Sequence, residues 1–179
     1  MTNPSILIIL ATMKQNASLD ASFWINAYNA DLVEFLPNYF VVFVCDEVAS
    51  EITYPLDVLK IKVAASPLLF QEWCSSGHIT QQNPAKPVDW FHVGENAAIA
   101  LAIEHGYWLL MDDANPYHMA KSRGLRVVGT SDLAVFLYDQ EQLTYEQCVQ
   151  AFERLRSSKQ QRRNALIVLE KLARAKGER

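Results

Sequence analysis

The sequence is poor in cysteine and has no long apolar run. Its three cysteines, Cys45, Cys74 and Cys148, are odd in number and widely spaced, which argues against a disulfide framework and favours a reducing compartment. The apolar run at residues 5–11 is far shorter than a membrane span, and no basic residue precedes it as a secretory signal requires. We therefore expect a cytoplasmic protein that has no membrane segment. Cys74 and His78 are four residues apart, but two candidate ligands do not make a zinc site.

Basic residues are scarce in the first 150 positions. These hold seven Lys or Arg residues against 17 Asp or Glu residues, whereas residues 151–179 hold nine against three. The net charge of −4 therefore hides an acidic body and a basic tail. The plainer interpretation of the tail is a solvated helix face, and the alternative is a surface that faces phosphate groups.

The length of 179 residues and the apolar content of 50% predict one domain with a sizeable core. We expect an amino-terminal extension over residues 1–16, a domain over residues 17–142, and a helical appendage over residues 143–179 that packs on the same domain. Internal repeats and low-complexity segments are absent from the sequence.

The most informative stretch begins at Gly94 and reads first as a helix and a strand. Small and apolar residues recur every three or four positions up to His105, and Gly106 then ends the predicted helix. Residues 107–111 are an apolar run without alternation, which is typical of a strand covered on both faces of a parallel sheet.

A second helix and strand follow, over residues 116–123 and 125–128, with Asn115 as the predicted helix cap. A strand, a helix and a strand in so few residues predict a right-handed crossover between parallel strands. Asp112 and Asp113 should then lie at the carboxyl-end edge of the sheet, where open α/β sheets bind ligands.

The amino half repeats this alternation. A short strand should end at Asp20, and a helix capped by Ser22 should continue to Pro37. Residues 75–88 contain two prolines and no periodicity, which predicts an inserted loop. The other predicted elements are a strand over 41–45, a helix from Asp46, a strand over 59–63, and helices over 67–73 and 131–138, followed by two helices that open with the capping boxes Thr144/Gln147 and Ser158/Gln161.

Four acidic positions come from separate parts of the chain: Asp20, Glu51, Glu95 and Asp113, with Asp112 beside the last. Two follow strands, and two sit on helices that could lean over the same edge. Carboxylates that crowd together raise one another's pKa unless a cation offsets their charge. The cluster therefore predicts Mg²⁺ or Mn²⁺, which take oxygen ligands, and a metal-assisted hydrolysis.

These residues carry a resemblance. The segments LDASFWIN, VASEI, GENAAIALAIEHG and LLMDDANPYHMAKSRGLRVVGT, in this order, resemble a PIN domain, and in particular its prokaryotic branch with GE-xx-AI-x-LA and LLxDD motifs. The resemblance covers roughly residues 17–138. It implies a three-layer α/β/α fold with a mainly parallel sheet and a Mg²⁺ or Mn²⁺ site. It also implies catalytic carboxylates at Asp20, Glu51, Glu95 and Asp113, and metal ligation by Asp20, Glu95, Asp112 and Asp113.

The branch often has a basic residue after the DD pair, where this sequence has Ala114 and Asn115. His118 and Lys121 could substitute one turn further on. At Ser131 we favour a helix cap over a metal-linked hydroxyl. An RNA substrate would need a basic track, for which the candidates are Lys121, Arg123 and Arg126 near the site and Arg154, Arg156, Arg162 and Arg163 in the tail.

Two functions remain open at this point. The first is a metal-dependent endoribonuclease that cuts single-stranded RNA, with a role as the toxin of a toxin–antitoxin pair, a cognate antitoxin as partner and a homodimer as a candidate assembly. The second is a non-catalytic PIN-like module that binds RNA or protein. A phosphatase of the haloacid dehalogenase type is disfavoured, because it needs a second Asp two residues after Asp20, where Ser22 stands.

Overall fold

The computed structural model describes residues 13–58, 65–156 and 158–178. The apolar run at residues 5–11 and the strand predicted over residues 59–63 lie outside this part of the chain. The amino half contains β1 (Gln15–Leu19), α2 (Ala21–Asn29), the 3₁₀ turn η1 (Val33–Phe35), α3 (Leu36–Tyr39), β2 (Phe40–Val44), α4 (Asp46–Val58), α5 (Ala65–Ser75) and β3 (Ile79–Gln81). The carboxyl half contains α6 (Val93–His105), β4 (Trp108–Leu110), α7 (Ala114–Ser122), β5 (Val127–Val128), α8 (Thr130–Asp139), α9 (Tyr145–Arg154) and α10 (Lys159–Ala175).

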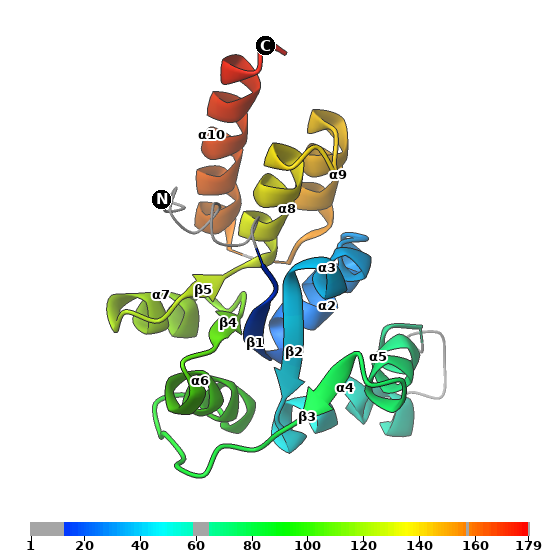
Figure 1. Cartoon of the computed structure of the whole chain (residues 1–179), viewed down its shortest axis with the longest axis vertical. Coiled ribbons are helices and arrows are strands. Elements are labelled where there is room, and N and C mark those ends of the chain that lie inside the picture. The colour runs from blue at the N-terminus through cyan, green and yellow to red at the C-terminus, as the bar shows by residue number, and fades with distance from the viewer. Residues whose placement is uncertain (1–12, 59–64, 157, 179) are drawn as a thin grey trace.

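The strands form one parallel sheet in the order β3-β2-β1-β4-β5 (Figure 1). The chain builds outward from β1 to β2 and β3, and then returns through α6 to place β4 on the other side of β1. The strand order therefore reverses between β1 and β4. A reversal of this kind opens a crevice at the carboxyl ends of the two strands, which is where open α/β sheets bind ligands. Asp20 directly follows β1, and Asp112 stands two residues after the end of β4.

Helices cover the sheet on both faces, which confirms the predicted three-layer α/β/α fold. α6 packs against β1 and β4, where the Ser18 hydroxyl donates a 2.8 Å hydrogen bond to the Ala98 carbonyl. The other face of β1 packs into the main apolar core, which contains Ala17 and Trp24. The same core extends to Leu169 of α10, because α8 and α9 bridge the sheet to the last helix. Figure 1 shows α8, α9 and α10 gathered at one end of the molecule and α6, α4 and α5 at the other.

The helix after β1 differs from the sequence prediction at both ends. Its N-cap is Asp20, whose carboxylate accepts the Ser22 amide at 3.0 Å, so the predicted cap Ser22 lies inside the helix. The helix ends at Asn29 and does not continue to Pro37. Asp31 is in the left-handed region at φ 57°, a backbone conformation that no helix residue can adopt, and a separate turn and helix follow it.

Two further predictions are wrong in detail. The helix predicted from Pro116 begins at Ala114, and its N-cap is Asp113 instead of Asn115. Proline in a first helical turn costs little because its missing N–H would have no partner there. The loop predicted over residues 75–88 contains β3, a three-residue edge strand paired with β2. A segment this short gives no readable alternation.

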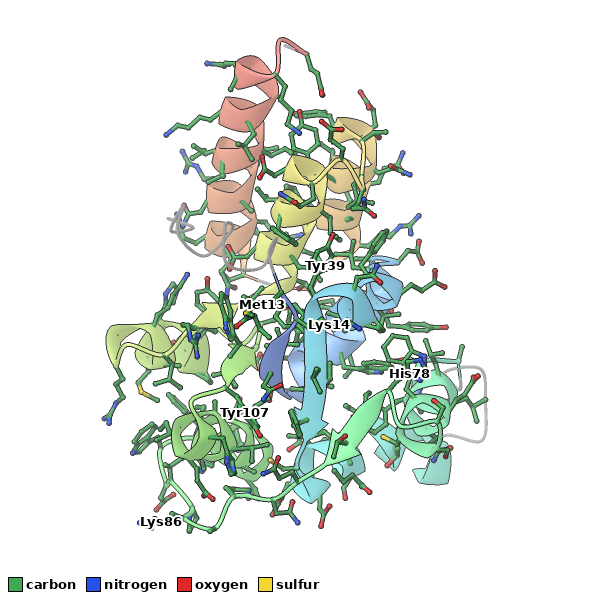
Figure 2. All side chains as sticks on the ribbon, in the orientation of Figure 1. Met13, Lys14, Tyr39, His78, Lys86 and Tyr107 are labelled. Carbon is green, nitrogen blue, oxygen red and sulfur yellow. The ribbon has the colours of Figure 1, made fainter. Side chains whose placement is uncertain are left out.

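The rest of that loop runs from β3 to α6 around one end of the molecule, and Figure 2 shows Lys86 at its outer limit. The boundary predicted at residue 17 falls inside β1, which begins at Gln15. Within the described residues, no helix is long and apolar enough to span a membrane.

Candidate functional site

Asp20 lies at the carboxyl end of the central strand and is 1% exposed. Its carboxylate accepts hydrogen bonds from the Ser22 amide at 3.0 Å and from the Ser22 hydroxyl. Burial and, less strongly, the negative charges of Asp113 and Glu51 raise the pKa of Asp20 to about 7, against the opposing effect of the Ser22 hydrogen bonds. A carboxyl group in this setting is hard to ionise unless a cation lies nearby.

Asp113 reaches the same region from the end of β4. Its backbone forms the N-cap of α7, but its carboxylate makes no capping hydrogen bond, and the residue is exposed. Its charge acts on both Asp20 and Glu51. The structure therefore brings together Asp20 and Asp113, from two adjacent strands, at one edge of the sheet.

Glu51 of α4 contacts the first turn of α6 at Gly94. A Cβ atom added to Gly94 would lie 2.7 Å from Cδ of Glu51, so only glycine leaves room for this carboxylate. Partial burial and then the charge of Glu95 raise the pKa of Glu51, while a hydrogen bond from the Gly94 amide lowers it. The amino end of a helix stabilises an anion, which explains why Glu51 lies there.

Glu95 has a structural use as well as a place in the cluster. Its carboxylate accepts the backbone amide of His92, the N-cap of α6, at 2.8 Å. This contact is one half of a capping box. Because the charge of Glu95 raises the pKa of Glu51, the two carboxylates also lie close to each other.

Asp112 belongs to a different network, although the sequence offered it as a metal ligand. Its carboxylate accepts the Asn26 side-chain amide at 2.6 Å, the Thr130 amide at 2.7 Å and the Thr130 hydroxyl. It is 3% exposed, and burial raises its pKa to about 6 against these hydrogen bonds. Three donors occupy its oxygens, so Asp112 ties β4 to α2 and α8, whereas Asp113 faces the other carboxylates.

Sequence reasoning missed two members of this network, Asn26 and Gln161. The Gln161 side chain donates to the Asp112 carbonyl at 3.2 Å, and the Asn26 side-chain carbonyl accepts the Arg156 amide at 3.0 Å. The sequence marks Gln161 only as part of the Ser158 capping box and does not mark Asn26 at all, because Asp112, which both residues contact, is distant in the sequence. α8 is capped by Gly129, so the helix-cap interpretation of Ser131 is wrong.

The donor set fits a hard divalent cation in chemical kind. Among residues 13–58, 65–156 and 158–178, no three His, Cys, Asp or Glu side chains form a ready-made metal-ligand group. Asp20, Glu51, Glu95 and Asp113 nevertheless present carboxylate oxygens whose charges destabilise one another. A divalent cation with oxygen ligands would relieve that repulsion.

The comparison with known families decides the fold family. A family model described as a PIN domain (DUF3368) matches residues 17–177, nearly the whole chain. The chain belongs to the PIN-domain family. PIN domains are generally nucleases and typically use divalent metal ions, so this chain has the fold of a nuclease. No curated protein matches it significantly.

In this PIN domain, Lys121 and Arg126 both donate hydrogen bonds to groups within the protein. Lys121 donates a 2.5 Å hydrogen bond to the Tyr117 hydroxyl, which in turn donates to Asp132 at 2.7 Å. Arg126 precedes β5 and donates to the Gly106 carbonyl at 2.5 Å, which places it at the amino-end edge of the sheet, opposite the carboxylates. The expectation that Arg126 lies near the site is therefore wrong.

The basic tail of the PIN domain is anchored beside Asp112 by the Asn26 and Gln161 contacts described above. Its cations differ in their surroundings. Arg154 forms an exposed ion pair with Asp31, and Arg162 donates to the Leu155 carbonyl at 3.3 Å. Arg156 and Arg163 are exposed. These two remain the tail residues best placed to meet a polyanion.

Proposed function

We propose that this PIN domain is a metal-dependent endoribonuclease that hydrolyses phosphodiester bonds of single-stranded RNA, with Asp20, Glu51, Glu95 and Asp113 as its catalytic carboxylates. The observation that carries the proposal is the setting of Asp20. Its carboxyl group is buried at the strand-order reversal, with a pKa raised to about 7 by burial and by the charges of Asp113 and Glu51. Evolution of a stable fold alone gives no reason to bury a carboxylate beside two others.

Asp20, Glu95 and Asp113 are the residues that would hold Mg²⁺ or Mn²⁺, because they present oxygen ligands from three elements. When bound, the ion would lower the pKa of a water molecule and offset charge on the phosphodiester.

The chain's own residues orient these groups. The Ser22 amide and hydroxyl fix the Asp20 carboxylate, and the His92 amide fixes Glu95. Glu51 is the most solvent-accessible member of the group apart from Asp113, and the Gly94 amide holds it at the start of α6. It is therefore placed to accept a proton from the attacking water as a general base.

A non-catalytic module that binds RNA or protein is the second candidate. Two observations favour it: both oxygens of Asp112 accept hydrogen bonds from within the protein, and Lys121 is held by Tyr117. The toxin role, the cognate antitoxin, the homodimer and the cytoplasmic location all stay predictions. A small open reading frame beside the gene would support the toxin role, since a toxin is normally encoded next to its inhibitor.

The test is cleavage of end-labelled single-stranded RNAs by purified protein in Mn²⁺, in Mg²⁺ and in EDTA. We expect internal cuts that require the metal and that disappear in Asp20→Asn. Asparagine is also a good helix N-cap, so this variant should keep the fold. Intact RNA in all three conditions, with RNA binding preserved, would favour the non-catalytic module. Cleavage by Asp20→Asn at the wild-type rate would point to a contaminating nuclease.

A further inference from the structure

Arg123 lies over the ring of Trp90, a residue that precedes the first turn of α6. Its guanidinium carbon is 3.9 Å from the centre of the Trp90 ring. Arg123 is exposed at the carboxyl end of α7, whereas Trp90 is half-buried and packs against the main core. Within the described residues, no carboxylate forms an ion pair with Arg123. The indole supports one face of the guanidinium, and solvent reaches the residue from outside.

Asn96 holds the backbone of Trp90 in place, and thereby the pair of Trp90 and Arg123, which we call the platform. Its side-chain carbonyl accepts the amides of Trp90 at 2.9 Å and Phe91 at 2.8 Å, and its amide group donates to the Phe91 carbonyl at 2.7 Å. Asn96 is 9% exposed and follows Glu95 in α6. The residue that fixes Trp90 is therefore the neighbour of a proposed catalytic carboxylate.

The platform also adjoins the cluster through His92. This residue lies two positions after Trp90, its amide binds Glu95, and its charge lowers the pKa of Glu51. On the other side, α7 joins Asp113 to Arg123. A helix of this length spans about 13 Å at 1.5 Å per residue.

We propose that Arg123, supported by Trp90, binds one base of the RNA strand close to the scissile phosphodiester. This proposal rests on the proposed function, of which it names a binding subsite. Guanidinium planes stack on unpaired bases, and a planar cation that already lies on an aromatic ring loses little freedom when it does so. The positive charge also lies where an acidic site would otherwise repel a polyanion.

A second arginine in the same chain supplies a matched control. The Arg126 guanidinium lies 5.2 Å from the centre of the Trp108 ring, but at the opposite edge of the sheet. Arg123→Gln and Arg126→Gln therefore each remove one positive charge from a tryptophan ring, and Arg126→Gln also removes the hydrogen bond to the Gly106 carbonyl. A melting temperature close to that of the parent protein would show that each variant is folded.

The experiment measures binding of a fluorescent single-stranded RNA to the Asp20→Asn protein, with each arginine variant added in turn. Arg123→Gln should weaken binding by about tenfold, the size expected when one base no longer stacks, and Arg126→Gln should not. Arg123→Lys keeps the charge but not the plane, so it should also weaken binding while the salt dependence stays the same. An RNA series with one abasic position should show one sensitive base in the parent protein and none in Arg123→Lys.

Equal affinities of Arg123→Gln and Arg126→Gln would overturn the proposal. So would parent-like binding by Arg123→Lys, because charge alone would then explain the effect of Arg123→Gln. Cleavage by the protein with Asp20 intact, measured in parallel, separates this subsite from the proposed function. If binding to one base depends on Arg123 but the protein cleaves no RNA, the subsite is supported and the proposed hydrolysis is wrong. If the protein cleaves RNA but binding does not depend on Arg123, the proposed hydrolysis is supported and the subsite is wrong.

Discussion

The Glu51 carboxylate lies against the α carbon of Gly94, so that a Cβ atom at residue 94 would be 2.7 Å from Cδ of Glu51. This contact joins α4 to the first turn of α6 and holds one acidic side chain of the proposed site in place. It involves only the end of a flexible and accessible side chain on one partner. The contact can therefore be broken without damage to the core.

Gly94→Ala tests that relationship. Glu51 should swing away, so RNA cleavage should fall at least tenfold, whereas Mn²⁺ affinity should change less because Asp20, Glu95 and Asp113 stay in place. The free energy of unfolding should stay the same or rise by up to about 1 kcal/mol, because alanine is the better helix former. RNA cleavage assays in Mn²⁺, isothermal titration with Mn²⁺ and denaturant unfolding measure the three quantities.

A double-mutant cycle provides the control for Gly94→Ala. In a Glu51→Ala background the glycine substitution should have no further effect on RNA cleavage, since the displaced group is already absent. An additive decrease would show that Gly94 affects cleavage independently of Glu51.

The buried carboxyl of Asp20 predicts a pH dependence of stability in EDTA. Its pKa rises from 3.8 to about 7 on folding, so the native state holds a proton that the unfolded state releases between these values. The stabilisation from this group is thus complete below about pH 4 and is lost as pH rises through about 7, by up to about 4 kcal/mol. Denaturant unfolding at several pH values measures this slope.

Asp20→Asn is the control for the pH dependence. It should flatten most of the slope and be more stable than the wild-type protein at pH 8. A smaller slope in the same direction should remain from Asp112, whose pKa of about 6 is also raised. A wild-type protein whose stability rises from pH 4 to 7 would contradict the buried setting of Asp20.

Asp112→Asn and Asp113→Asn should differ in kind, although the two residues are neighbours. Asparagine has one acceptor oxygen where aspartate has two, so its NH₂ group would face either the Thr130 amide or the Asn26 side-chain amide, which are both donors, and the variant should lose about 2–4 kcal/mol of unfolding free energy. Asp113→Asn should keep its stability but lose the rise in melting temperature that Mn²⁺ gives the wild-type protein. Thermal melts with and without Mn²⁺ measure both effects. If both variants lose the Mn²⁺ effect equally and neither is destabilised, Asp112 is a metal ligand as the sequence predicted.

We expect the arginines of the basic tail to contribute unequally to RNA binding. Replacing Arg156 and Arg163 by Gln should lower the salt slope of single-stranded RNA binding by about 0.7 for each phosphate that is no longer neutralised. Arg154→Gln should leave that slope unchanged, because Arg154 pairs with Asp31. Fluorescence anisotropy over a range of salt concentrations measures the slopes, and Mn²⁺ affinity should be the same in all these variants. Identical slopes in the wild-type protein and in the Arg156/Arg163 variant would show that these two residues belong to a solvated helix face and do not contact RNA phosphates.

Much of the fold could be predicted from local sequence patterns. Gly106 adopts the left-handed conformation that ends α6, as expected for glycine there, and the capping boxes at Thr144 and Ser158 do open α9 and α10. The parallel pairing of β4 with β5 follows from the short strand, helix and strand between Tyr107 and Val128. Each of these features depends on residues a few positions apart, which is why the sequence reveals them.

The three-residue strand β3 and the end of α2 could not be found in this way. β3 forms because its backbone pairs with the edge of β2, and its own amino-acid composition does not predict a strand. α2 ends just before Asp31, which is in the left-handed region. Aspartate tolerates this conformation, but the presence of an aspartate in a sequence does not predict it.

The sequence by itself determined that acidic residues follow the strands and open the helices of a PIN domain. Only the tertiary structure decided which of them face one another. Asn26 and Asp112 are 86 residues apart, yet their hydrogen bond turns Asp112 inward and leaves Asp113 for the cluster. Arg123 and Arg126 are three residues apart, yet folding places them against different tryptophans. The reason is physical: hydrogen bonds and charges act over a few ångströms in space, and local sequence patterns carry no record of the distant segment that folding brings within that range.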